Sequence, residues 1–274
     1  GIRADNPWEV FAADTPEAAL IHAAAERLGT APAMPEISLP QLPDRLDTRN
    51  PSVTSTQEAL GRVLTRLADF PDAANRIVTM SPDVATSTHL SGWINKVGVF
   101  APEAARDFDD SAQRMLKWQP NPSGQHIELG ISEMNLFMAL SQFGLAQEMT
   151  GQHLVPIGTV YDPFVCRGLD ALIYALYVGA KVIFAGTPAG VSLSPEGGAH
   201  QSTVTPSLGI ELPGVRFYEP AFAYEVEWLL LDAIARCSDR VNGSSTYLRL
   251  STKAIDAGLA AAVRERISEE QLRA

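Results

Sequence analysis

The sequence predicts an α/β fold in which a parallel sheet carries helices on both faces, preceded by an extended N-terminal linker. Short apolar segments alternate with segments of helical periodicity, which is typical of parallel strands joined by helices. Several apolar segments, such as residues 154–161 and 181–186, are nearly continuous, as expected for strands buried on both faces. With 274 residues, of which 46% are hydrophobic and 19% charged, the chain has enough apolar material for one large core.

Residues 1–50 are expected to form an N-terminal helix and a proline-rich linker. Apolar spacing predicts the helix over residues 16–28, with Gly29 just past its end. Four prolines then fall between positions 32 and 43 in a polar setting, which favours an extended segment outside any core. The first five residues have the character of neither a signal peptide nor an initiator methionine, so we expect a start that was processed or cut from a longer chain.

Residues 51–256 carry the signals of the main domain. Ser55 and Glu58 form a capping box that opens a helix with an apolar face reaching Leu67. The remaining expected helices cover residues 132–148, 168–179 and 221–237. The expected strands cover residues 76–80, 125–129, 154–161, 181–186, 216–218 and 246–250. Residues 101–124 are expected to form a long surface loop with one short helix.

Composition excludes several classes of function. The net charge of −11 argues against nucleic acid or an anionic membrane surface as a partner, because both require a basic surface. No apolar run is long enough to cross a bilayer. Cys166 and Cys237 have neither CxxC nor metal-ligand spacing, which favours a reducing, cytoplasmic compartment and predicts no metal site. GxGxxG, GxxxxGK[ST], GxSxG and HExxH motifs are all absent.

Candidate functional residues follow the predicted strands, because open parallel sheets bind ligands at the carboxyl ends of their strands. Glu133 begins a helix after one strand, and a carboxylate there is stabilised by the helix dipole whatever its function. Tyr161 and Phe164 lie in a turn-rich loop, where aromatic side chains either pack in the core or stack on a flat heterocycle. His200 lies on a glycine-rich stretch as either an acid/base or a surface residue. Asp83 is either a turn residue or part of a site.

Four segments together resemble one enzyme family. These are residues 130–133, 161–164, 195–200 and 219–225. In order and spacing they are similar to the pyrimidine-binding middle domain of the homodimeric pyruvate or 2-oxoacid dehydrogenase decarboxylating component. That family belongs to the transketolase-like superfamily, whose cofactor is thiamine diphosphate. The resemblance covers nearly the whole chain, and residues 124–135 are most similar to the branch that includes 2-oxobutanoate dehydrogenases.

The resemblance implies roles for individual residues in binding the cofactor. Glu133 matches the glutamate that protonates the aminopyrimidine ring, which lets the ring's amino nitrogen act as a base toward the thiazolium carbon. Phe164 matches the aromatic residue that stacks on this ring, and Tyr161 matches a neighbouring active-site tyrosine. Arg167 lies one position from where a family arginine aligns, so the resemblance assigns it no role.

The resemblance also implies a catalytic set beyond the ring-binding residues. His200 matches a substrate-facing histidine, and Glu196 matches an acid beside it in the same loop. Asp83 matches an aspartate near the pyrimidine amino group. Together with Glu133, His200 and Asp83 are therefore the expected catalytic residues.

A partner is expected because the family's Gly-Asp-Gly motif, which holds Mg²⁺ and the diphosphate, is absent. The resemblance implies a diphosphate-binding domain or subunit that completes the site, self-association into a dimer or heterotetramer, and a lipoyl acyltransferase or carrier protein as acceptor. Residues 257–274 are expected to begin a linker to a missing C-terminal domain.

Three functions remain open from the sequence. The first is decarboxylation of a 2-oxoacid with transfer of the acyl group to a lipoyl carrier. The second is transketolase-like transfer of a two-carbon ketol unit, to a carrier protein in a specialised pathway. The third is a non-catalytic scaffolding subunit, which retention of Glu133, Phe164 and His200 speaks against.

Overall fold

The structure, a computed structural model, describes residues 5, 6, 8–29, 39–104 and 118–273. The chain divides into two compact units, residues 1–36 and 37–274. The first unit contains α1 (Pro16–Leu28), which begins where the Thr15 hydroxyl accepts the Ala18 N–H and ends at Gly29 with φ +68°. The predicted N-terminal helix and its glycine end are therefore confirmed.

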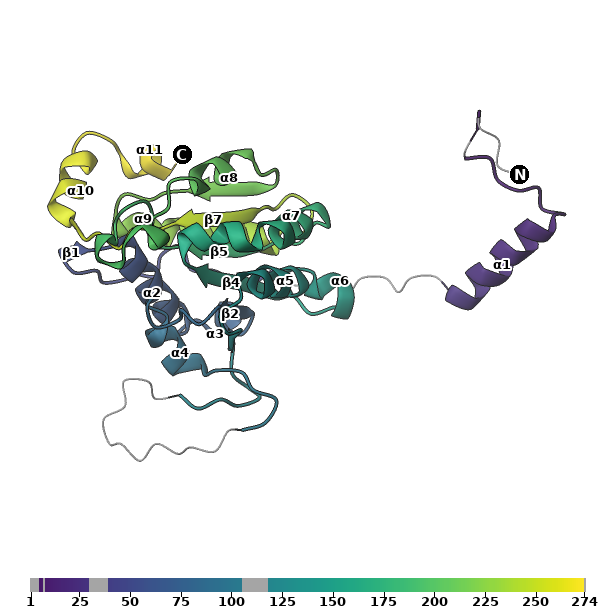
Figure 1. Ribbon diagram of the computed structural model, residues 1–274, viewed down its shortest axis with the longest axis horizontal. Helices are drawn as coiled ribbons and strands as arrows, with labels where there is room; N and C mark the ends of the chain where they lie inside the picture. Colours follow the sequence, from purple (N-terminus) through teal and green to yellow (C-terminus); the bar gives the residue numbers. More distant parts are fainter. Residues whose placement is uncertain (1–4, 7, 30–38, 105–117, 274) are drawn as a thin grey trace. The chain divides into compact units, whose positions relative to one another are not determined.

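The second unit is built on a sheet of six parallel strands in the order β3-β2-β4-β5-β7-β6 (Figure 1). The strands are β2 (Ile77–Ser81), β3 (His126–Glu128), β4 (Val155–Val160), β5 (Ile183–Gly186), β6 (Val215–Tyr218) and β7 (Ser245–Arg249). The predicted parallel sheet is confirmed, strand by strand, with ends that shift by one or two residues. A separate antiparallel pair, β1 (Val53–Thr54) with β8 (Ile255–Asp256), was not predicted.

Helices cover both faces of the sheet, as predicted. One face packs against α2 (Thr56–Leu67), α4 (Ser91–Val97) and α9 (Ala223–Ser238), and the other against α5 (Glu133–Gly144), α7 (Leu169–Tyr177) and α8 (Thr205–Glu211). Strand residues alternate between two apolar clusters, because neighbouring side chains of a strand point to opposite faces. Ile183, for example, joins the cluster beneath α2 and α9, while Phe184 joins the cluster beneath α5 and α7.

Several elements differ from the sequence expectation. The single helix expected over residues 132–148 is two helices, because Leu145 leaves helical geometry at φ −107° and ψ 8°. The helices α4 and α8 were not predicted. Within the expected loop 101–124, residues 105–117 lie outside the described residues. The remaining short elements are α3 (Pro71–Ala74), α6 (Ala146–Thr150), η1 (Asp162–Gly168), η2 (Ser194–Glu196), η3 (Gly198–His200), α10 (Ala257–Arg264) and α11 (Glu269–Arg273).

The segment before the main domain is part of the core at one position. Leu46 is 1% exposed and packs with side chains of α2 and α9, although the prolines predicted a segment outside any core. The Glu227 carboxylate of α9 fixes this segment by accepting the backbone N–H groups of Leu46 at 2.8 Å and Thr48 at 2.9 Å. Composition did not reveal this contact because it is made by the backbone.

The C-terminal residues expected to begin a linker contain α10 and α11, which contact α9 through stacked cations. The Arg264 guanidinium lies 3.8 Å from the ring centroid of Tyr224, and the Arg273 guanidinium lies 4.4 Å from that of Trp228. Such contacts stabilise each helix locally. The domain boundaries at 50/51 and 256/257 remain predictions.

Glu227→Gln is expected to lower the free energy of unfolding by about 1–3 kcal/mol at neutral pH, because charge-assisted bonds to two backbone N–H groups are weakened. Burial raises the pKa of Glu227, but hydrogen bonds from Thr48 and Leu46 outweigh it and hold the pKa below the ordinary 4.5. The stabilisation is therefore complete above pH 4.5 and is lost as the pH falls through the lowered folded-state pKa.

Urea unfolding of wild type and Glu227→Gln at several pH values, from about 7 down to about 3, checks this expectation. Glu211→Gln, on an exposed side chain of α8, is the matched control. A difference between wild type and Glu227→Gln that stays constant down the pH series would contradict the role of the ionised carboxylate.

Candidate functional site

The sheet order places a ligand crevice beside β2. From β2 the chain passes to β3 on one side, whereas from β4 it passes to β5 on the other side. An open sheet binds ligands at such a switch point, here between β2 and β4. Asp83 follows β2, Glu133 follows β3 and Tyr161 follows β4 directly. His200 lies in the loop after β5. The sequence-predicted residues therefore gather along the carboxyl edge of one sheet.

Glu133 is the first residue of α5 and is only 7% exposed. Its position is fixed from two sides. The Ser132 hydroxyl caps the helix by accepting the Asn135 N–H at 3.4 Å. On the other side Gly168 packs so closely that a Cβ there would overlap the Glu133 carbonyl and the Phe137 ring. The glycine thus allows η1 to approach the start of α5, and the buried carboxylate lies at the positive end of a helix.

Tyr161, Phe164 and His200 form one aromatic cluster. The ring centroids of Tyr161 and Phe164 are 6.2 Å apart, and the His200 ring lies edge-on to both at 5.4 Å and 5.5 Å. The predicted ring-binding aromatics and the predicted substrate-facing histidine are therefore in contact. These geometries are within the range of favourable aromatic pairing.

Arg167 connects Glu133 to the aromatic cluster. Its Nη1 lies 3.4 Å and 3.5 Å from the two carboxylate oxygens of Glu133, and its guanidinium carbon lies 4.6 Å from the Phe164 ring centroid. No role was predicted for this arginine. The signal that could have found it is its spacing of three residues from Phe164 in a helical turn.

Glu196 and His200 lie together at the outer side of the cluster. Glu196 Oε2 is 3.8 Å from His200 Nε2, and the Glu196 side chain is mostly exposed. His200 Nδ1 is buried and has no hydrogen-bond partner among the described residues. An uncommitted ring nitrogen in a cluster of polar and aromatic groups is available for a ligand or a water molecule.

Asp83 lies near the aromatic cluster and is connected to it through Ser87. It is exposed, with φ +64°, and lines a cavity of about 450 Å³ together with Ser87 and Glu128. The Tyr161 hydroxyl donates to Ser87 Oγ at 2.9 Å, so this cavity borders the aromatic cluster. Glu128 is itself paired with the buried His126, whose Nε2 lies 2.6 Å from its Oε1.

A buried polar network beneath the cluster was not predicted. Asp162 is fully buried and accepts hydrogen bonds from the Tyr247 hydroxyl, from Thr205 Oγ1 at 2.6 Å and from Arg249 Nε at 3.0 Å. Arg249 also donates to Glu219 at 2.5 Å and to the Ser202 carbonyl at 2.7 Å. The sequence signal was available, because an arginine inside the apolar strand 246–250 needs a buried partner.

The electrostatics of this network hold its donors in their protonated forms. Burial raises the pKa of Tyr247, and the Asp162 charge raises it further, so the hydroxyl keeps the proton that it donates. Burial lowers the pKa of Arg249, but Asp162 and Glu219 outweigh burial and raise it. The network therefore fastens η1, which carries Phe164, and the loop before α8 to strand β7.

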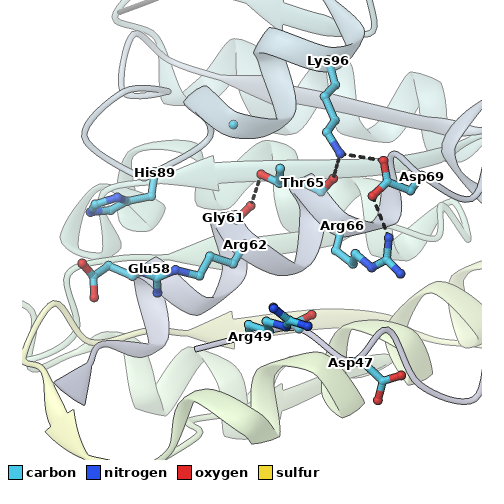
Figure 2. Close-up of a pocket in the computed structure, with 12 residues that line it drawn as sticks. Asp47, Arg49, Glu58, Gly61, Arg62, Thr65, Arg66, Asp69, His89 and Lys96 are labelled. Atoms are coloured by element: carbon cyan, nitrogen blue, oxygen red, sulfur yellow. Dashed lines mark hydrogen bonds and ion pairs between the residues drawn. The ribbon is translucent and has the colours of Figure 1, made fainter. Parts of the chain in front are cut away.

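A second cleft, of about 640 Å³, lies between α2, α4 and the segment 47–49 and contains none of the predicted site residues (Figure 2). Lys96 and Arg66 both bind Asp69 there, at 2.7 Å and 2.8 Å. Hydrogen bonds from Lys96 and then from Arg66 lower the pKa of Asp69. Lys96, Arg66 and Asp69 therefore neutralise one another as a surface ion-pair network.

Two further properties bear on function. Among residues 5, 6, 8–29, 39–104 and 118–273, no three His, Cys, Asp or Glu side chains gather closely enough to hold a metal ion. In the same part of the chain, none of the helices has the length and apolar character needed to cross a membrane.

Solved transketolases share the fold. The chain superposes on transketolase from Leishmania mexicana with a TM-score of 0.58 at 18% identity, covering 89% of this chain and 31% of that chain. A transketolase from Pichia stipitis gives a TM-score of 0.57 over 79% of this chain and 29% of that one. The chain therefore shares its fold with part of these transketolases.

Residues 46–255 match the family described as the pyruvate dehydrogenase E1 component middle domain, and the chain belongs to this family. Among curated relatives, the pyruvate dehydrogenase E1 component of Corynebacterium glutamicum is 27% identical over 184 residues, which cover 66% of this chain and 20% of that protein. The E1 component of Haemophilus influenzae is 24% identical over 236 residues, which cover 82% of this chain and 27% of that protein. The chain thus spans between 20% and 27% of the length of these two relatives.

Arg249→Met is expected to lower the free energy of unfolding by about 3–5 kcal/mol, because it leaves the Asp162 carboxylate buried without its cation. The double variant Asp162→Asn/Arg249→Met removes both charges and is expected to recover much of this loss. Urea unfolding of the wild type, both single variants and the double variant measures the coupling. Additive losses in the double variant would show that the two side chains do not depend on each other.

Proposed function

We propose that the chain is the pyrimidine-binding half of a thiamine-diphosphate-dependent 2-oxoacid dehydrogenase, of the pyruvate or 2-oxobutanoate type. The observation that carries this proposal is the buried Glu133 carboxylate, which Arg167 bridges to the Phe164 ring at the carboxyl edge of a transketolase-like sheet. The proposed activity is decarboxylation of a 2-oxoacid and transfer of the acyl group to a lipoyl carrier. The family assignment supports it, and low identity to the relatives leaves the substrate as part of the proposal.

The described residues fit a flat, protonated heterocycle. Glu133 offers a buried carboxylate to a ring nitrogen, and Phe164 offers an aromatic face that the same guanidinium, that of Arg167, contacts together with Glu133. Thiamine diphosphate would supply the carbon that adds to the 2-oxoacid and would take up the electron pair that CO₂ leaves behind. In this proposal Glu133 holds a proton at the ring nitrogen and Phe164 stacks on the ring. Tyr161 packs against Phe164 and His200 beside the ring.

His200 and Glu196 are proposed to contact the substrate. His200 Nδ1 is buried without a hydrogen-bond partner among the described residues, and its Nε2 lies 3.8 Å from Glu196, so the ring is able to hydrogen-bond a carboxylate or carbonyl oxygen of a substrate. Asp83 is proposed to act near the amino group of the pyrimidine, from the cavity that Ser87 connects to Tyr161.

A diphosphate-binding domain or chain is proposed to complete the site and to hold Mg²⁺. This proposal rests on the missing Gly-Asp-Gly motif and on the greater length of the matched relatives. We propose that the complete enzyme is a dimer or heterotetramer in the cytoplasm and works with a lipoyl acyltransferase. The first measurement is native mass spectrometry, which detects a second polypeptide and bound thiamine diphosphate in the same assembly.

Ketol transfer is the second candidate, because the superposed solved structures are transketolases. The two reactions differ in their products. A 2-oxoacid substrate releases CO₂, whereas transfer of a two-carbon unit from a ketose phosphate releases none. Assays with both donors on the assembled enzyme therefore separate the candidates, and an assembly that binds no thiamine diphosphate would favour the scaffolding alternative.

Glu133→Gln in the assembled enzyme is expected to reduce turnover by about 10²–10⁴-fold, the usual contribution of a positioned acid or base. The thermal midpoint should change little, because glutamine keeps the size of the side chain. Glu211→Gln, on the exposed face of α8, is the matched control and should retain full turnover. Near-normal turnover in Glu133→Gln would remove this glutamate from the proposed reaction.

A further inference from the structure

Arg167 makes the same two kinds of contact that the proposed function assigns to the cofactor ring. Its guanidinium points N–H donors at both oxygens of Glu133 and lies over the face of Phe164. A guanidinium and an aminopyrimidine are both planar, nitrogen-rich and able to stack on an aromatic ring while donating to a carboxylate. The two groups therefore compete for one carboxylate and one aromatic face.

Local structure explains why Arg167 lies over Phe164. Both residues belong to the 3-10 helix η1, in which side chains three positions apart lie directly above one another. Tyr161 directly precedes η1, and its ring lies 6.2 Å from that of Phe164, so Tyr161, Phe164 and Arg167 follow one another in space. The backbone of η1 is fastened below by Asp162, so Arg167 is presented to Glu133 without any movement of the chain.

The contacts of Arg167 are of a kind that a ligand can displace. The two Nη1–carboxylate distances of 3.4 Å and 3.5 Å exceed the roughly 2.7–2.9 Å of a strong charge-assisted hydrogen bond. The Arg167 side chain is 58% exposed, whereas that of Glu133 is 8% exposed. The arginine can therefore swing into solvent while the buried carboxylate stays in place.

We propose that Arg167 is a resident competitor of the cofactor's pyrimidine ring and sets the affinity of the site for it. This inference rests on the proposed function, because it requires the ring to occupy Glu133 and Phe164. Ring binding then includes release of the guanidinium from both residues. The measured affinity is therefore the intrinsic affinity multiplied by the fraction of chains in which Arg167 is disengaged.

Arg167→Met tests the competition, because methionine keeps an extended side chain without the planar cation. The probe is 4-amino-5-hydroxymethyl-2-methylpyrimidine, which lacks the thiazolium charge and so separates competition from charge repulsion. Calorimetric titration of the full chain is expected to show binding about 5- to 30-fold tighter in Arg167→Met, the sum of a weak exposed ion pair and one cation–π contact. Arg167→Lys should fall between the two proteins, because lysine keeps the charge but not the plane.

Two controls make each outcome decisive. Arg216→Met removes an exposed cation near the amino end of β6 and should leave the affinity unchanged. Glu133→Gln should weaken binding of the same probe. Unchanged or weaker binding in Arg167→Met, with wild type and Glu133→Gln behaving as expected, would overturn the competition alone. Failure of every protein to bind the probe would overturn the proposed pyrimidine site and the competition with it.

Discussion

The buried ion pair between Asp162 and Arg249 is the interaction on which the rest of the candidate site depends. Asp162 opens η1, and Arg249 ends β7, so the pair joins the loop after β4 to the interior of the sheet. Thr205 and the Ser202 carbonyl extend the network to the segment that follows His200. A charged pair at this depth is stable only with all its hydrogen bonds satisfied, and here both partners have several.

This arrangement separates the residues that stabilise the fold from the residues that form the candidate site. The network below η1 is buried, densely hydrogen-bonded and close to Gly186, where a Cβ would overlap the Asp162 carboxylate. Above η1, Tyr161, Phe164 and Arg167 are partly or largely exposed and make looser contacts. The candidate site therefore combines a rigid base with exposed side chains that can adjust.

The sequence predicted the sheet and most helices because buried parallel strands and amphipathic helices have strong periodic signals. Glu133, Phe164 and His200 were found through motifs, and the structure brings these three to one edge. Leu46 could not be found, because its burial depends on backbone bonds to the distant Glu227. The helices α4 and α8 are short and follow loops without caps, and Asp162 reads as an ordinary turn residue until Arg249 is placed beside it.

The strand order has a consequence for how the chain acquires its structure during synthesis. β7 is the last strand of the large sheet in the chain, yet it lies inside the sheet between β5 and β6. The Asp162 carboxylate is therefore paired only after Arg249, 87 residues later in the chain, has been synthesised. A nascent chain halted before residue 249 would carry an open sheet and an unpaired carboxylate, a species prone to aggregation and to capture by chaperones. Because of this strand order, the candidate site can form only after most of the chain has been synthesised.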